Sequence, residues 1–197
     1  MNKGRRIGVQ GRPCDRLHLV AEGQVLLSRR DEVGQENALY LLGPGEVFGA
    51  GALLPEQRWL TNARALTDGC FHALPGARVA TLAEYYPQLA AQLFALLAAR
   101  LERAYHRLDF IVKQSARDRL LGLLTVLASY HGEDQGEQVW LPVQVTQAQL
   151  GSMVGLARET VARTLSELEA EGIVRRQGRE GYWLRQNACR NTSDAPS

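Results

Sequence analysis

Two arginines and a glutamate near position 160 are the side chains in this sequence best suited to recognising a nucleic acid. They are Arg158, Glu159 and Arg163, and they lie in a segment whose apolar residues recur with helical spacing at Val161, Leu165 and Leu168. The three charged residues fall outside that apolar stripe. Arginine can donate two hydrogen bonds to guanine O6 and N7, and glutamate can accept one from cytosine N4. An Arg-Glu pair on the leading turn therefore predicts a helix suited to a G·C step.

A second, shorter helix is predicted immediately before this one. Thr146 and Gln149 form a capping-box pattern, which starts a helix, and Gly155 stands where a tight turn must end it. Gly151 lets a neighbouring helix approach closely. Two helices joined by a glycine-containing turn predict a helix-turn-helix, whose second helix enters the major groove. The alternative is an ordinary helical hairpin whose surface charges are solvated.

Two short β-rich runs after the helices flank Gly178–Gly181 and predict a hairpin wing. This pattern favours the DNA interpretation over the helical hairpin. Side chains of the wing and of the two helices are expected to contact the DNA backbone and set the register. These candidates are Gln147, Thr160, Arg175, Arg176 and Arg179.

A long helix is predicted upstream, because no proline or glycine interrupts residues 88–121. Its apolar residues follow the 3-4 spacing of a coiled coil, which favours a dimer seam over a helix that packs only on its own domain. The expected interface residues are Phe94, Leu97, Leu101, Ala104, Leu108 and Ile111. The stripe changes phase at Ser115, which predicts a hinge before another helix, from Arg117 to Tyr130.

The N-terminal part, from residue 7 to about 80, consists of short apolar runs separated by glycine or proline, which is typical of a β-sandwich or barrel. We therefore expect an α+β protein with four parts. These are a β-domain (1–82), a long dimerisation helix (83–114), a winged helix-turn-helix (115–186) and a tail without regular structure (187–197).

Composition excludes several classes of protein. Three widely spaced cysteines, Cys14, Cys70 and Cys189, argue against a disulfide framework, a zinc ribbon or an iron–sulfur cluster. No apolar run is long enough to cross a membrane and no secretion signal is evident, so a cytoplasmic protein is expected. From Ser115 onward nine arginines meet ten acidic residues, which disfavours a non-specific architectural DNA protein. A β-barrel enzyme is disfavoured because no acid/base or metal cluster is present.

The segment Gly151–Leu165, with the Leu-Glu-Ala-Glu-Gly-Ile-Val that follows, resembles the winged-helix signature of the cyclic AMP receptor protein/FNR family. Gly43–Gly49 resembles the loop before that family's nucleotide pocket, Asn62–Leu66 its following strand, and Leu89–Lys113 its dimer helix. The resemblance implies a β-roll, here shortened because the first helix and strand of longer members have no counterpart. It also implies a cytoplasmic homodimer that binds double-stranded DNA at a palindrome of TGTGA-like half-sites. Arg158, Glu159 and Arg163 occupy the family's base-reading positions. RNA polymerase is the further partner that it implies, and activation the expected role.

Departures from that family's pattern predict that cyclic AMP is not bound. The position of the ribose-binding glutamate holds Ala50, and that of the phosphate-binding arginine falls at Trp59, although a one-residue slip would bring in Arg58. A buried phosphate without its cation is heavily penalised. The polar pair that meets the adenine is replaced by Ala104 and Tyr105, and this tyrosine can fill the cavity.

Other effectors find little support in the residues. The spacing of Cys70 and His72 fits a haem ligand set, but both are expected to be core residues, and neither cofactor nor metal is predicted. The favoured interpretation is a regulator that needs no effector. A regulator gated by an unidentified small molecule or redox signal is the alternative.

Overall fold

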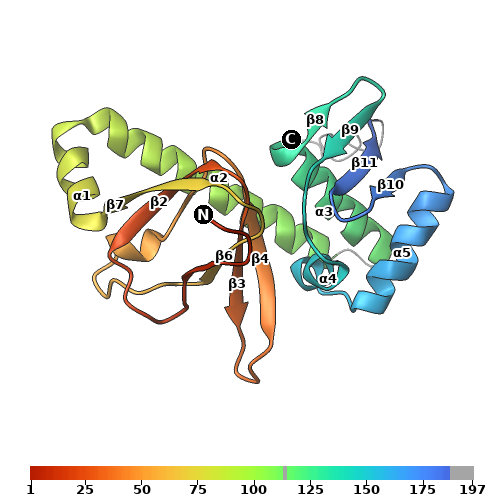
Figure 1. The fold of residues 1–197 in the computed structure, drawn as a ribbon, viewed down its shortest axis with the longest axis horizontal. Coiled ribbons are helices and arrows are strands. Elements are labelled where there is room, and N and C mark those ends of the chain that lie inside the picture. The colour runs from red at the N-terminus through yellow and green to blue at the C-terminus, as the bar shows by residue number, and fades with distance from the viewer. Residues whose placement is uncertain (113–114, 187–197) are drawn as a thin grey trace. The chain divides into compact units, whose positions relative to one another are not determined.

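The computed structural model describes residues 1–112 and 115–186, without the side chains of Arg107, Phe110 and Ile111 (Figure 1). Two compact units are distinguished, Met1–Ala104 and Tyr105–Ser197, and each is treated separately below as the N-terminal and the C-terminal unit. The predicted tail, 187–197, lies outside the described residues. No described helix is long and apolar enough to cross a membrane.

Two antiparallel sheets build the N-terminal unit, as the short apolar runs predicted. One has the strand order β1-β6-β3-β4 and the other β5-β2-β7. Their bounds are β1 (Arg6–Gly8), β2 (Arg16–Glu22), β3 (Val25–Arg30), β4 (Glu36–Leu42), β5 (Val47–Phe48), β6 (Asn62–Ala65) and β7 (Cys70–Pro75), with a 3-10 turn, η1 (Ala50–Leu53). β3 and β4 form a hairpin whose turn is closed by Gln35, which donates to the Asp31 carboxylate at 2.8 Å.

Inward-facing side chains of both sheets form the core of this unit. Phe48 and Trp59 pack in it with aliphatic residues of β2, β3, β4 and β6. His18 lies among their rings, with centroid distances of 4.8 Å to Phe48, 5.5 Å to Trp59 and 5.3 Å to Phe71. Its Nδ1 has no hydrogen-bond partner. The imidazole is therefore held by packing in an apolar site.

Two helices follow the strands, α1 (Gly76–Tyr85) and α2 (Pro87–Val112). The predicted long helix is confirmed as α2, which has 26 residues. It begins at Pro87 and not at residue 83, because residues up to Tyr85 belong to the separate helix α1. The strands end at Pro75, before the expected residue 80, because Gly76 already begins α1.

Cys70 and His72 correct one expectation about the N-terminal unit. Alternation along β7 does place both side chains on the same side of the strand, but that side is exposed, not in the core. The intervening Phe71 is the residue that turns inward, toward His18 and Phe48. Periodicity of two gives which residues share a face, but not which face is covered.

The C-terminal unit comprises α3 (Ala116–His131), α4 (Gln147–Val154), α5 (Arg158–Ala170) and a sheet of order β10-β11-β9-β8. The strands are β8 (Glu133–Asp134), β9 (Gln138–Leu141), β10 (Val174–Gln177) and β11 (Gly181–Arg185). Ser115 caps α3 by accepting a hydrogen bond from the Asp118 amide. The predicted hinge at Ser115 adjoins residues 113–114, which are outside the described residues.

Acid should destabilise the N-terminal unit through His18. Burial lowers the pKa of His18 below its ordinary value of 6.5, so the unfolded chain takes up the proton at higher pH than the folded chain. The contribution to stability is therefore complete above pH 6.5 and is lost as pH falls below it. We expect the denaturant concentration at the unfolding midpoint of the wild type to decrease when the pH is lowered from about 7.5 to about 5.5. The decrease should be smaller in His18→Phe. Equal pH dependence of both proteins would contradict this assignment.

Candidate DNA-binding interface

The helix α4 begins and ends as its sequence predicted. The Gln149 amide donates to Thr146 Oγ1 at 3.2 Å, and the Thr146 amide donates to Gln149 Oε1 at 2.7 Å. This reciprocal pair is a complete capping box. Gly155 ends the helix in the left-handed region, with φ 68° and ψ 40°, where a side chain would be strained.

The turn between α4 and α5 depends on a close backbone approach at Gly151. The Leu156 amide donates to the Gly151 carbonyl at 2.8 Å, and a Cβ at Gly151 would collide with the Leu156 carbonyl oxygen. The same Cβ would lie 3.2 Å from Val161 Cγ2 on α5. The absence of a side chain at position 151 therefore lets the turn and α5 approach α4 closely, as predicted.

One face of α5 is anchored in the core of the unit, and the opposite face is exposed. Val161 and Leu168 have no exposed surface and Leu165 is 2% exposed. The predicted base-reading residues Arg158, Glu159 and Arg163 are all exposed. Arg163 lies 4.0 Å from Glu167, and their side chains are 72% and 55% exposed. Such a surface pair holds Arg163 weakly.

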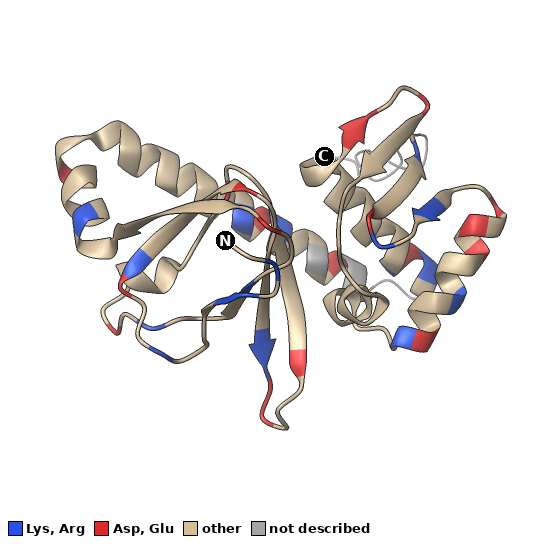
Figure 2. Cartoon of the chain, in the orientation of Figure 1, with Lys and Arg blue, Asp and Glu red and all other residues tan. Residues whose placement is uncertain are grey.

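The amino-terminal end of α5 carries opposite charges side by side (Figure 2). Arg158 and Glu159 open the helix, and Ala157 before them supplies no side-chain cap. The first backbone amides of α5 therefore have no side-chain partner at the cap position and carry the positive end of the helix dipole. Such a helix end attracts phosphate, while the two side chains offer a donor and an acceptor to base edges.

Among the residues predicted to contact the DNA backbone, those in the wing are the most exposed. β10 and β11 pair with Gln177 opposite Gly181, so Arg179 lies in the turn between them. Arg175 stacks over the Trp183 ring at 5.4 Å, and the Arg176 amide donates to Glu169 Oε1 at 3.1 Å. The last contact ties the wing to α5. On the two helices, Gln147 and Thr160 are partly exposed.

An exposed ion pair braces the far end of α5. Two nitrogens of Arg117 on α3 each lie 2.6 Å from an oxygen of Glu171, just after the helix. Hydrogen bonding from Arg117 lowers the pKa of Glu171, and the same bond raises the pKa of Arg117. Both groups therefore stay charged over the physiological range.

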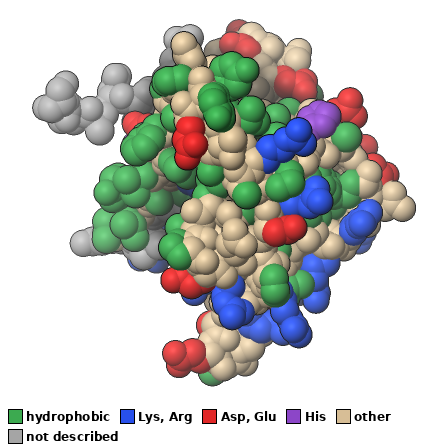
Figure 3. Space-filling view, turned by 90° about the vertical axis from the view of Figure 1, so that its left-hand side faces the viewer, with side chains coloured by type: hydrophobic (Ala, Val, Ile, Leu, Met, Phe, Trp, Pro, Cys, Tyr) green, Lys and Arg blue, Asp and Glu red, His purple; other side chains and the backbone are tan. Residues whose placement is uncertain are grey.

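The predicted dimer stripe on α2 is apolar and exposed to solvent. Phe94 is 77% exposed, Leu97 46%, Leu101 53% and Leu108 58%, and Ala104 is partly exposed. The side chain of Ile111 is outside the described residues. Large apolar side chains repeated along one face of a long helix mark an interaction surface. Figure 3 shows hydrophobic side chains gathered on one face of the molecule, beside a group of basic ones.

The residues expected at the family's nucleotide-binding positions are either buried in the core of the N-terminal unit or exposed. Trp59 is 8% exposed and packs with His18 and Phe48. Arg58 is exposed and donates to the Gly11 carbonyl at 2.9 Å, so a one-residue slip does not bring its charge into the core. Tyr105 is 58% exposed. The prediction that Tyr105 fills the cavity is wrong, because its side chain is exposed.

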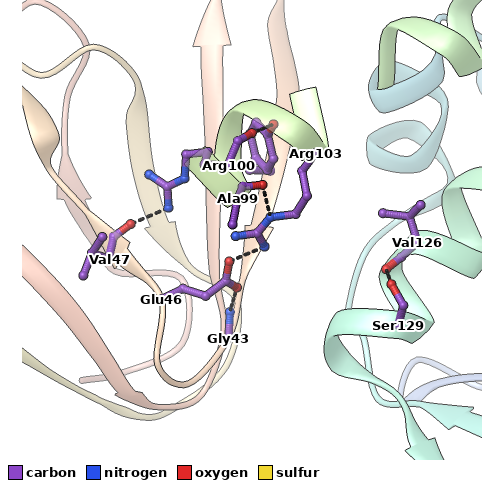
Figure 4. Close-up of polar contacts among 9 residues, drawn as sticks. Gly43, Glu46, Val47, Ala99, Arg100, Arg103, Val126 and Ser129 are labelled. Carbon is purple, nitrogen blue, oxygen red and sulfur yellow. Dashed lines mark hydrogen bonds and ion pairs between the residues drawn. The ribbon is translucent and has the colours of Figure 1, made fainter. Parts of the chain in front are cut away.

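Three polar residues of the N-terminal unit were missed in the sequence. Glu46, Arg100 and Arg103 form a partly buried cluster between α2 and the start of β5 (Figure 4). A signal was present, since both arginines continue a 4-3 spaced stripe that begins with Leu89, Leu93 and Leu96. Charged residues on such a stripe are ordinarily expected to be solvated, so the pattern alone does not indicate burial.

Comparison with known proteins agrees with this architecture. Residues 1–86 match the family model of the cyclic nucleotide-binding domain, and residues 118–186 match that of the Crp-like helix-turn-helix domain. The chain is 38% identical over 175 residues to a "Cyclic AMP receptor protein" of Thermus thermophilus, covering 88% of this chain and 77% of the relative. It is 34% identical to the transcriptional regulator SdrP of the same organism, covering 85% and 78%.

Solved structures show the same fold. A transcriptional regulator of the CRP/FNR family from Thermus thermophilus is 28% identical, with a TM-score of 0.77 over 100% of this chain and 98% of that one. FixK2 from Bradyrhizobium japonicum is 22% identical, with a TM-score of 0.82 over 100% and 96%. With two matching domain models in the same order and relatives above 30% identity, the chain belongs to the CRP/FNR family of dimeric, DNA-binding transcriptional regulators and is not an enzyme.

Proposed function

We propose that this protein is a homodimeric transcription activator that recognises a TGTGA-like palindrome without requiring cyclic AMP. Arg158, Glu159 and Arg163 read base edges in each half-site. Gln147, Thr160, Arg175, Arg176 and Arg179 contact the DNA backbone. The apolar stripe on α2 joins the two copies of the chain, and the β-domain of residues 1–82 packs on this helix. The protein acts in the cytoplasm, where RNA polymerase is its further partner.

The observation that carries the DNA-reading part of this proposal is the exposure of Arg158 and Glu159 on the uncapped first turn of α5. The apolar face of the same helix is buried, so α5 is held in place while Arg158 and Glu159 stay exposed. An Arg-Glu pair can recognise both bases of a G·C step. A half-site containing TGTGA offers such steps.

Independence from cyclic AMP is supported by the packing around Trp59. The relatives named as cyclic AMP receptors or as cAMP-activated regulators include proteins 38% and 27% identical to this chain. In this chain the expected phosphate position is occupied by an indole that is 8% exposed and lies 5.5 Å from His18. Ala50 offers no carboxylate to a ribose, and the charge of Arg58 stays at the surface. A cyclic nucleotide would have to displace core aromatic packing and bury its phosphate without a cation.

Titration of the purified protein into a labelled TGTGA-N6-TCACA duplex, at fixed salt and with and without cyclic AMP, tests this function. A scrambled duplex of the same length is the control. We expect selective binding that cyclic AMP does not alter. Binding that requires cyclic AMP would overturn the assignment of Ala50 and Trp59. Lack of selectivity under both conditions would favour gating by an unidentified small molecule or redox signal, or a different site.

Arg158→Ala should weaken binding to the intact half-site by about 1–3 kcal/mol and relax the preference at one base pair. The reason is the loss of a bidentate contact to a base, which carries sequence information. Competition titrations against single-base variants of the duplex measure both effects. Arg179→Ala serves as the matched control, because loss of a backbone contact should weaken all duplexes about equally. Uniform loss in Arg158→Ala would exclude base recognition by this residue.

Polar substitution of the α2 stripe should abolish binding to the palindrome. Leu101→Glu with Leu108→Glu places like charges in the proposed seam, and both side chains are exposed in the single chain, so its own fold should tolerate the change. Sedimentation gives the oligomeric state, circular dichroism the fold, and titration the affinity. The expected result is a folded monomer with much weaker palindrome binding. A monomer that binds as tightly as the wild type would contradict the proposed role of α2.

A further inference from the structure

The long helix α2 carries two neighbouring stripes with different environments. Between Pro87 and Ala104 none of its side chains is buried. The large side chains that are partly covered follow a 4-3-4-3 spacing through Leu89, Leu93, Leu96, Arg100 and Arg103, with the small Ala90, Ala99 and Ala104 partly covered beside them. The exposed apolar stripe begins one residue later along each turn. Along the covered stripe, the three leucines come first and the two arginines follow them. Polar contacts between α2 and the strands therefore replace apolar ones from Arg100 onward.

Arg103 forms a sheltered ion pair with Glu46. Its Nη1 lies 2.5 Å from Glu46 Oε1, and the two side chains are only 11% and 14% exposed. The other carboxylate oxygen of Glu46 accepts a hydrogen bond from the Gly43 amide at 2.8 Å. Both oxygens of Glu46 are therefore engaged, one by α2 and one by the loop that carries Glu46 (Figure 4).

Arg100 attaches the same turn of α2 to the neighbouring backbone. Its Nη2 donates to the Val47 carbonyl, at the first residue of β5, and its own carbonyl accepts a hydrogen bond from the Tyr40 hydroxyl of β4 at 3.2 Å. Burial lowers the pKa of Arg100, and the nearby Glu46 opposes that effect. One turn of helix is thus held from two strands and the loop between them.

Such a buried polar cluster fixes the orientation of α2 on the strands more than it strengthens their packing. Sheltered charges must be paired with good geometry, and an altered helix position would leave Glu46 or Arg103 charged without a partner. Hydrogen bonds with fixed directions also specify the rotation of α2 about its axis, which sliding leucine contacts specify poorly. The rotation of α2 decides where its exposed stripe points.

We infer that Arg100, Arg103 and Glu46 form a ligand-independent latch that sets the orientation of α2 required for DNA binding by the dimer. They are positioning residues and touch no DNA. The inference rests on the proposed function and assigns its regulation: contacts within the protein perform what an effector bound between the β-domain and α2 would otherwise do. An equilibrium between orientations of α2 is biased to the active one by these contacts.

A double-mutant cycle on the full-length protein tests the latch. Glu46→Gln and Arg103→Met are made singly and together, because the double variant removes both charges of this ion pair and keeps its fold more readily than either single variant, while Arg100 keeps its hydrogen bond to the Val47 carbonyl. We expect the folded double variant to bind the duplex roughly tenfold more weakly than the wild type. The salt dependence of its remaining binding should be unchanged, since the phosphate contacts are the same. Hydrogen exchange should be faster in the second half of α2.

Arg16→Met is the matched control, since Arg16 forms an ion pair with Asp15 at 3.8 Å in the same unit but with side chains 51% and 79% exposed. It should bind DNA as the wild type does. Wild-type affinity in the folded double variant, or a loss equal to that of Arg16→Met, would overturn the latch while leaving the proposed function intact. Failure of the wild type itself to select the duplex would overturn the function first.

Discussion

The arrangement of this protein depends on one helix that has to satisfy two surfaces at once. In α2 the covered stripe that ends in Arg100 and Arg103 and the exposed stripe of Phe94, Leu97 and Leu101 are displaced by a single residue along the chain. One residue corresponds to about 100° of rotation around a helix, so the two faces are adjacent. Any rotation of α2 about its axis that improves the contacts of one face therefore also moves the other face. In the proposed function two recognition helices meet one palindrome, which requires that this rotation be controlled.

The recognition helix was predictable because its signals are local. Thr146 and Gln149 are three residues apart and cap the same turn, and Gly155 ends the helix that they begin. Val161, Leu165 and Leu168 mark the buried face of α5 by spacing alone. Capping, glycine geometry and apolar periodicity are each set within a few residues of sequence. They agree here on one structure, so the fold of the C-terminal unit followed from the pattern.

The N-terminal unit was predictable only in outline, since its decisive contacts join distant residues. The ion pair of Glu46 with Arg103 spans 57 positions, and nothing near either residue indicates the partner. Alternation in β7 identified Cys70 and His72 as neighbours on one side, but which side is covered depends on how the sheets stack. For the same reason the sequence suggested Tyr105 as the residue filling the cavity, whereas Trp59, brought inward by the segment before β6, occupies the core.

Trp59 and the latch belong to the same physical problem. A pocket that holds a charged nucleotide has to keep polar groups in the core and needs its ligand to neutralise them, which makes the protein's orientation depend on ligand supply. In the proposed function, the indole packed on His18 and Phe48 takes the place of such a ligand in the core. On this proposal, the helix is oriented by groups of the chain itself. Arg100 and Arg103 are placed where α2 meets the loop carrying Glu46, and the proposed latch uses their directional bonds to supply the orientation that apolar packing alone leaves loosely specified.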